Sequence, residues 1–258
     1  MNLKKKVFNR LFLCDDLNNA SVIHATCQEE MKQIRNLGVK TPIAIIPNSI
    51  SLPEKFPCIS MPSSFRLCFL GRINPIKNID GLLRAWERSG LSKMNNAELV
   101  VIGDAKLEKE KIYLHELHQL EKQLCIYNVT WKGNLQGTEK DNELNSCSFL
   151  ILPSFSENFG MVVVEALIQG VPVIATRGTP WNILESERCG WWIENNVDKM
   201  AEMIERAYEL SLDERLSMAQ KGQNLVKQHF STPAISQSLM ELYSWILEEA
   251  NKPDFVYM

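Results

Sequence analysis

Paired cysteines of the kind that hold zinc or form a disulfide framework are missing from this sequence. The 7 cysteines are scattered, their number is odd, and no CxxC occurs. The histidines His115 and His118 stand three positions apart on a charged stretch with no third ligand nearby, so the solvent face of a helix is favoured over a metal site. The cysteines indicate reduced thiols, and we expect a cytoplasmic protein.

Other functional hallmarks are also absent. No apolar run reaches the roughly 18 to 20 residues that span a bilayer. The net charge of -3 argues against a dedicated nucleic-acid-binding protein, and we expect no nucleic acid as a partner. No GxGxxG follows a predicted strand, and neither a P-loop nor a GxSxG nucleophile elbow occurs. These absences exclude the simplest nucleotide-binding and hydrolase signatures.

The first 14 residues, MNLKKKVFNRLFLC, superficially resemble a signal peptide. Arg10 interrupts their apolar part, and Asp15 and Asp16 follow at once, so we reject that interpretation. We favour a helix that packs on a neighbouring domain. The alternative is a basic amphipathic helix that attaches the protein peripherally to the inner face of a membrane.

What the sequence does contain is an alternation of β-rich and helical stretches, with 45% hydrophobic residues to build a core. Expected strands lie at 21–25, 43–47, 66–71, 98–104, 128–133, 148–153 and 171–176. Expected helices lie at 27–38, 78–90, 106–124, 138–146, 159–169, 197–210, 213–228 and 233–249. Since the strands are continuous apolar runs, the pattern predicts an α/β fold in which helices cover both faces of a parallel sheet.

In open parallel sheets, ligands bind at the carboxyl ends of the strands. Five loops are expected at that edge: Gly71–Lys77, Gly103–Asp104, Gly133–Asn134, Ser154–Gly160 and Arg177–Thr179. The sequence therefore predicts one crevice that gathers these loops.

Glu157 and Glu165 are the carboxylates that this crevice could use. Free N–H groups at the start of the helix near Phe159 favour a phosphate, and Gly160 lets a ligand approach the backbone closely. At ~1.5 Å rise per residue, the eight-residue separation spans at most roughly 12 Å, about the length of a sugar–diphosphate–ribose unit. Carboxylates accept two hydroxyl hydrogen bonds and suit vicinal diols. The alternative is that Glu157 caps the helix and Glu165 points to solvent.

The loop GRINPIK, Gly71–Lys77, is the second candidate. Its Arg72 and Lys77 can bind a diphosphate, Arg72 through two parallel hydrogen bonds of its guanidinium and Lys77 through its ammonium charge. The same cations can offset the negative charge that develops on a departing diphosphate. The alternative is two solvated loop cations.

Together these residues resemble the retaining family-4, or group 1, glycosyltransferases of the GT-B fold. The stretch FLGRINPIKNIDGLLRAW is similar to the family's phosphate-binding loop, and SFSENFGMVVVEALIQGVPVIAT is similar to its E-x7-E motif. HATCQEEMKQIRNLGVKTPIAIIPNSI resembles the stretch that closes the first domain. Three such motifs in the family's order make the resemblance more specific than any one of them.

The resemblance implies a nucleotide-sugar donor such as a UDP- or GDP-sugar, bound without cofactor or metal, and transfer with retention of configuration. By that resemblance Glu157 contacts the transferred sugar, and Glu165 contacts the ribose. Arg72 and Lys77, after Gly71, bind the diphosphate. The backbone of a four-residue segment contacts sugar and phosphate: Asn158, Phe159, Gly160 and Met161.

The expected domains follow from the same comparison. Residues 1–50 would be a remnant of the GT-B N-terminal domain, 51–62 a linker, 63–231 the Rossmann-like donor-binding domain, and 232–258 a C-terminal helix that crosses back. By this comparison most of the N-terminal domain has no counterpart, and we expect the chain to be a fragment of a longer protein, the partner of a second chain, or an inactive remnant. Two strands without their sheet expose unpaired edges, and we expect self-association, which light scattering at high concentration would test.

We therefore expect a glycosyltransferase, or its donor-binding half, acting on a glycan or lipid-linked acceptor in polysaccharide or lipopolysaccharide biosynthesis. The alternative is a non-catalytic nucleotide-sugar-binding subunit that needs a partner chain. A third possibility, another GT-B enzyme such as an epimerase or phosphorylase, is disfavoured by the combination of GRxxxxK and E-x7-E.

Overall fold

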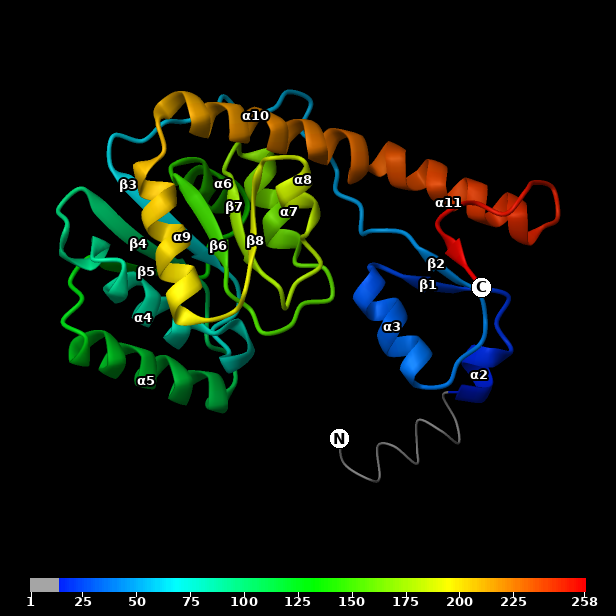
Figure 1. Cartoon of the computed structure of the whole chain (residues 1–258), viewed down its shortest axis with the longest axis horizontal. Helices are drawn as coiled ribbons and strands as arrows, with labels where there is room; N and C mark the ends of the chain where they lie inside the picture. The colour runs from blue at the N-terminus through cyan, green and yellow to red at the C-terminus, as the bar shows by residue number, and fades with distance from the viewer. Residues whose placement is uncertain (1–13) are drawn as a thin grey trace. The chain divides into compact units, whose positions relative to one another are not determined.

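The computed structural model describes residues 14–258, so the expected N-terminal amphipathic helix lies outside the described residues. The chain forms two compact units (Figure 1). The first unit comprises the chain up to Ser51 together with Gln228–Met258, and the second comprises Leu52–Lys227. Residues 51–62, expected to be a linker, fall almost entirely within the second unit.

The second unit is built on a six-stranded parallel sheet with the strand order β5-β4-β3-β6-β7-β8. Its strands are β3 (Phe65–Leu70), β4 (Ala97–Ile102), β5 (Val129–Gly133), β6 (Phe149–Leu152), β7 (Val173–Thr176) and β8 (Gly190–Ile193). The chain starts in the middle, builds outward to β5, and returns to β6 beside β3. This reversal of strand order creates a switch point between β3 and β6, where open α/β sheets bind ligands.

Helices cover both faces of this sheet (Figure 1). They are η2 (Pro75–Lys77), α4 (Ile79–Arg88), η3 (Leu91–Lys93), α5 (Glu108–Gln123), α6 (Gly137–Asn145), α7 (Met161–Ile168), α8 (Ile183–Ser186), α9 (Val197–Glu209) and α10 (Leu212–His229). Helix α4 packs against α5 and α9, and α6 packs against α7. The expected parallel sheet with helices on both faces is confirmed.

A large part of the core of this unit lies between the sheet and helices α4, α5 and α9. Leu67, Phe69 and Trp86 are fully buried in it. The indole Nε1 of Trp86 donates to Oδ1 of Asn128 at 3.0 Å. The Nδ2 of Asn128 in turn donates to the carbonyls of Leu91 at 2.9 Å and Ala97 at 2.8 Å. One amide therefore satisfies polar atoms from three neighbouring segments.

The last strand of this six-stranded sheet, β8, was not among the predicted strands. It pairs with β7 in parallel, and a Cβ at Gly190 would lie 2.1 Å from the carbonyl oxygen of Val173. Only glycine permits this close approach of the two strands. Trp191 stacks on Phe149 of β6 with ring centroids 5.4 Å apart, so it packs on the sheet.

The first unit has a small three-stranded sheet. Strands β1 (Ile23–Ala25) and β2 (Ile43–Ile45) are parallel, and β9 (Val256–Tyr257) pairs antiparallel with β2. The described part of this unit also contains helices α2 (Cys14–Asn18), α3 (Gln28–Asn36) and α11 (Thr232–Ile246). The expectation of two strands with no further partner was therefore wrong in part, because the last residues of the chain cover one side of β2. The expected self-association stays a prediction.

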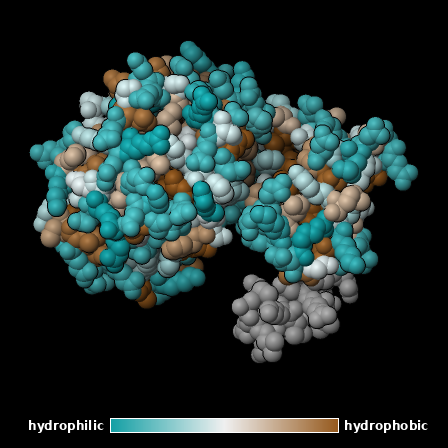
Figure 2. All heavy atoms as spheres, in the orientation of Figure 1, coloured by the Kyte–Doolittle hydropathy of each residue, from teal (hydrophilic) through white to brown (hydrophobic). Residues whose placement is uncertain are grey.

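Within residues 14–258, no helix is both long and apolar enough to cross a membrane. On the face shown in Figure 2, hydrophobic residues are scattered among hydrophilic ones. The six cysteines whose side chains are described are free thiols.

We expect Asn128→Ala to lower the free energy of unfolding by about 1–3 kcal/mol, because the buried indole N–H of Trp86 loses its acceptor. Urea denaturation would measure the change. Asn95→Ala, at an exposed position nearby, is the matched control. Equal stability of the two variants would contradict the role assigned to the Asn128 amide.

Candidate functional site

The carboxyl ends of β3, β4 and β5 are held together by backbone contacts. The N–H of Gly71 donates to Ile102 at 3.0 Å, and the N–H of Gly103 donates to Gly133 at 2.8 Å. A Cβ at Gly103 would lie 1.9 Å from the carbonyl oxygen of Gly71. The loops after β3 and β4 can approach so closely only because position 103 has no side chain.

The Gly71–Lys77 loop is anchored through Glu110, on α5. Asn74 caps η2 by accepting from the N–H of Ile76 at 3.1 Å, and its Nδ2 donates to Glu110 Oε1 at 3.2 Å. Glu110 Oε2 accepts from the N–H groups of Lys106 and Leu107, each at 3.1 Å. The carboxylate thus ties the loop after β3 to the loop after β4.

Glu110 is only 1% exposed, and its ionised form is stabilised where it lies. The N–H of Leu107 and the amide of Asn74 hold the pKa of Glu110 below its usual range, and the positive charge of Arg72 acts in the same direction. The guanidinium of Arg72 therefore lies in a region where a fixed carboxylate favours a cation.

The Ser154–Gly160 loop is held by hydrogen bonds to three neighbouring segments. The N–H of Phe155 donates to Ile76 at 2.8 Å, and the N–H of Glu157 donates to Gly178 at 3.0 Å. Asn195 Nδ2 donates to the carbonyl of Ser154 at 3.0 Å. These bonds connect the loop after β6 with the loops after β3, β7 and β8.

Lys77 and Glu157 form an ion pair between two of these loops. Lys77 Nζ donates to Glu157 Oε1, and Ser154 Oγ donates to the same oxygen at 2.8 Å. The two charged side chains are only 16% and 13% exposed. Two of the residues predicted to act on the donor are thus in direct contact, and each neutralises the charge of the other.

Helix α7 follows the loop and carries the second glutamate. Gly160 precedes the helix with a φ of 83°, a conformation that favours glycine, and Met161 is the first helical residue. Phe159 is buried against Trp181, whose Nε1 donates to the Phe159 carbonyl. Glu157 therefore precedes the helix as expected, while Asn158 and Phe159 form the turn that leads into it.

Glu165 lies one turn into α7 and does not simply point to solvent. Its Oε1 is 3.0 Å from Nζ of Lys140, on α6, and its side chain is 26% exposed. Glu165 and Arg72 line one cavity of about 270 Å³. Its lining residues are Leu70, Gly71, Arg72, Ile102, Gly103, Asp104, Lys106, Asn134, Lys140, Val162 and Glu165.

The candidate site is this cavity together with the Lys77–Glu157 pair. The two are neighbours, because Cε of Lys77 lies 3.9 Å from the position that a Cβ on Gly71 would take, and Gly71 lines the cavity. Arg72, Lys77, Glu157 and Glu165 therefore gather at the carboxyl ends of the strands. This arrangement brings two cations and two carboxylates together at this edge of the sheet.

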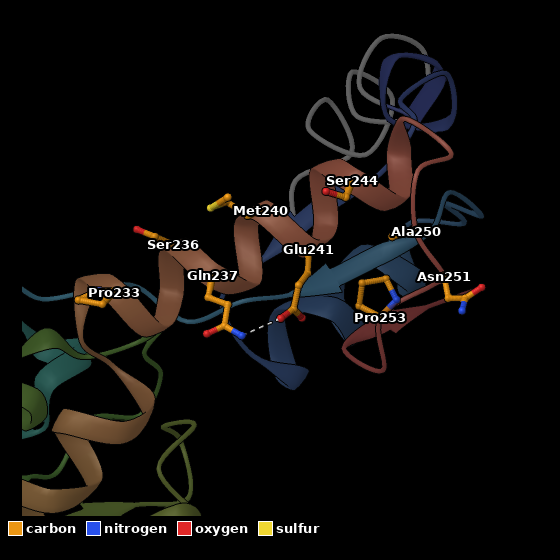
Figure 3. Close-up of a pocket in the computed structure, with 9 residues that line it drawn as sticks. All are labelled: Pro233, Ser236, Gln237, Met240, Glu241, Ser244, Ala250, Asn251 and Pro253. Carbon is orange, nitrogen blue, oxygen red and sulfur yellow. Dashed lines mark hydrogen bonds between the residues drawn. The ribbon is translucent and has the colours of Figure 1, made fainter.

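A second hollow, of about 620 Å³, lies in the first unit along α11 (Figure 3). Gln237 and Glu241 point toward one another there and are joined by a hydrogen bond of 3.1 Å. Glu241 is the one charged residue among those that line it, so this hollow offers a phosphate group no cation.

In the described part of the chain, no three His, Cys, Asp or Glu side chains are grouped so that they could hold a metal ion. His115 contacts Gln119 at 2.9 Å, and His118 packs on Trp131 with ring centroids 4.6 Å apart. These two histidines therefore have other partners on and beside α5.

Residues 61–225 match the family model described as glycosyl transferases group 1. The chain belongs to this family. A sucrose synthase from Nitrosomonas europaea is 29% identical over 159 residues, covering 54% of this chain and 20% of that protein.

Two solved structures of similar fold support the architecture. A sucrose-phosphate synthase from Thermosynechococcus elongatus superposes with a TM-score of 0.80 at 18% identity, covering 96% of this chain and 63% of that one. Anabaena HepE, solved in complex with UDP and glucose, gives a TM-score of 0.77 at 21% identity, covering 92% of this chain and 66% of that one. The chain thus shares the GT-B fold of these proteins and spans less than two thirds of their length.

Sequence reasoning missed several residues that shape the site of this group 1 glycosyl transferase. Glu110 and Lys140 lie on helices that were identified, but their partners are 36 and 25 positions away in the sequence. Asn195 follows the unpredicted strand β8. The one available signal was Glu110 itself, a carboxylate at the start of a predicted helix.

We expect Glu110→Gln to destabilise the protein at pH 7, because the carboxylate anchors two loops. The folded pKa of Glu110 lies below its unfolded value of about 4.3, so its contribution is complete above that value and disappears as pH falls through the folded pKa. The difference between the melting temperatures of the two proteins should therefore be constant from pH 7 down to about pH 5 and should shrink only in measurements continued below about pH 4.3, to about pH 3. Glu116→Gln, at an exposed position on the same helix, is the control, and a pH-independent difference would contradict this account.

Proposed function

We propose that the candidate site binds a nucleotide-diphosphate sugar and that the chain acts in transferring the sugar to a glycan or lipid-linked acceptor with retention of configuration. The observation that carries the proposal is the placement of Arg72 and Glu165 in one cavity at the switch point, beside the Lys77–Glu157 pair. HepE, which shares the fold, was solved with UDP and glucose, and this supports a UDP-sugar as the donor.

The cavity size suits the nucleoside end of such a donor. Its volume of about 270 Å³ is below the roughly 300–1,000 Å³ of pockets that enclose a whole ligand. The nucleoside would occupy the cavity with its ribose on Glu165, and the diphosphate would run over Gly71 toward Lys77 and the start of α7. Backbone N–H groups at Gly160 and Met161 would face the phosphates.

The Lys77–Glu157 pair then has to separate when the donor binds. Lys77 turns to the diphosphate, and Glu157 becomes free to accept hydroxyl groups of the transferred sugar. As the bond between sugar and phosphate breaks, Lys77 and Arg72 offset the charge that develops on the leaving diphosphate. No residue in this scheme requires a metal, and we propose that these two cations supply the positive charge.

A second candidate is a non-catalytic subunit that binds the nucleotide sugar and needs a partner chain for turnover. The observation that favours it is the size of the first unit's sheet, which has three strands in the described residues against six in the second unit. Calorimetry with UDP and GDP, followed by a turnover assay with UDP-glucose, separates the candidates. Binding without turnover supports the second, and the absence of binding to either nucleotide contradicts both.

We expect Lys77→Ala to weaken UDP binding about tenfold or more, since a charge-assisted hydrogen bond contributes roughly 1.5–3 kcal/mol and 1.4 kcal/mol corresponds to a factor of ten. Isothermal calorimetry would measure it. Lys93→Ala, at an exposed position on η3, is the control. Equal UDP affinity of the Lys77→Ala variant and the wild type would place Lys77 outside the site.

Glu157→Gln should behave differently with the same ligand. UDP lacks the transferred sugar that Glu157 would bind. In the variant, UDP also no longer competes with the Glu157 carboxylate for Lys77, so the affinity for UDP should stay equal or rise. Any higher affinity of the wild type for UDP-glucose than for UDP should be lost in this variant. A loss of UDP affinity as large as that of Lys77→Ala would contradict the division of roles between the two residues.

A further inference from the structure

Lys140 is a charged residue of the cavity to which the sequence assigned no role. It lies in the first turn of α6, and its Nζ is 3.0 Å from Oε1 of Glu165 on α7. Both side chains are partly buried, with exposures of 21% and 26%, and both line the cavity with Arg72. The ion pair therefore belongs to the wall of the candidate site.

The position of Lys140 gives no benefit to its own helix. Cations are disfavoured in the first turn of a helix, where the backbone dipole is positive, and Lys140 is the fourth residue of α6. Its other acidic neighbour, Asp141, is 4.0 Å away and nearly half exposed. The favourable interaction of this lysine is thus the one that it makes with Glu165 across the packed helices α6 and α7.

The pair leaves Glu165 able to bind a ligand. An ionised carboxylate has about four acceptor positions, and one ammonium group uses one of them. The other positions remain available for two hydroxyl groups of a ribose. A glutamate that is already held in place loses less side-chain freedom when the ligand arrives, so its contacts contribute more to affinity.

We propose that Lys140 is a positioning residue that orients Glu165 toward the ribose diol and thereby sets the preference for ribonucleotides over deoxyribonucleotides. This inference rests on the proposed function, because it needs a nucleotide in the cavity. If Lys140 acted only by attracting the phosphates with its charge, it would raise the affinity for ribonucleotides and deoxyribonucleotides equally. The proposed role predicts an effect on the ribonucleotide alone.

The test compares UDP with 2′-deoxy-UDP on the full chain by calorimetry, or GDP with 2′-deoxy-GDP if the chain binds guanine nucleotides. Wild type should prefer the ribonucleotide about tenfold, as expected for a lost hydrogen bond to a charged group. Lys140→Met should reduce that preference at least threefold while the affinity for the deoxynucleotide changes less than twofold. Lys140→Arg should retain most of the preference, because it keeps the donor.

Lys132→Met is the matched control, since Lys132 also pairs with a glutamate, Glu143 on α6, at 3.5 Å but does not line the cavity. An unchanged preference in Lys140→Met, or an equal loss for both nucleotides, would overturn the inference while leaving the proposed function in place. An equal effect of Lys132→Met would overturn it as well. If wild type binds no nucleotide, the proposed function itself fails.

Discussion

Two ion pairs between neighbouring segments hold four charged side chains at one edge of the six-stranded sheet. Lys77 pairs with Glu157, and Lys140 pairs with Glu165. Each of the four side chains is at most about a quarter exposed, and such charges are costly to keep unpaired. The site is therefore preassembled from opposite charges that a ligand carrying both phosphates and hydroxyl groups could rearrange.

The sheet makes this arrangement possible. Since β3 lies beside β6, the loops that follow these two strands meet although 80 residues separate Lys77 from Glu157. The close approach at Gly71 and Gly103 and the carboxylate of Glu110 then fix the loop that carries Arg72. The rigid sheet positions the loops, and the loops position the charges, which is the usual relation between scaffold and site.

The parts of the fold that sequence could predict are those with strong local patterns. The strands at 66–71 and 98–104 are continuous apolar runs, and their structural counterparts β3 and β4 differ from them by two residues or fewer at each end. The expected strand at 148–153 and helix at 159–169, on either side of Glu157, likewise have their counterparts in β6 and α7. Strand β9 could not be predicted, because two residues have no pattern of their own and depend on pairing with β2.

The contacts within the site depend on distant pairs. The sequence around Lys140 is typical of a solvent-exposed helix position. Only the packing of α6 on α7 brings Lys140 to Glu165. Strand β8 combines a glycine with two tryptophans, and its strand conformation follows from the close fit of Gly190 to β7. In both cases the deciding interaction is tertiary, and no single stretch of sequence contains it.

A crystal structure of the chain with UDP bound would test the central claim most directly. The account predicts the ribose hydroxyls on Glu165, the diphosphate between Arg72 and Lys77 near the start of α7, and a separated Lys77–Glu157 pair. UDP bound elsewhere, or bound with its phosphates away from Arg72 and Lys77, would contradict it.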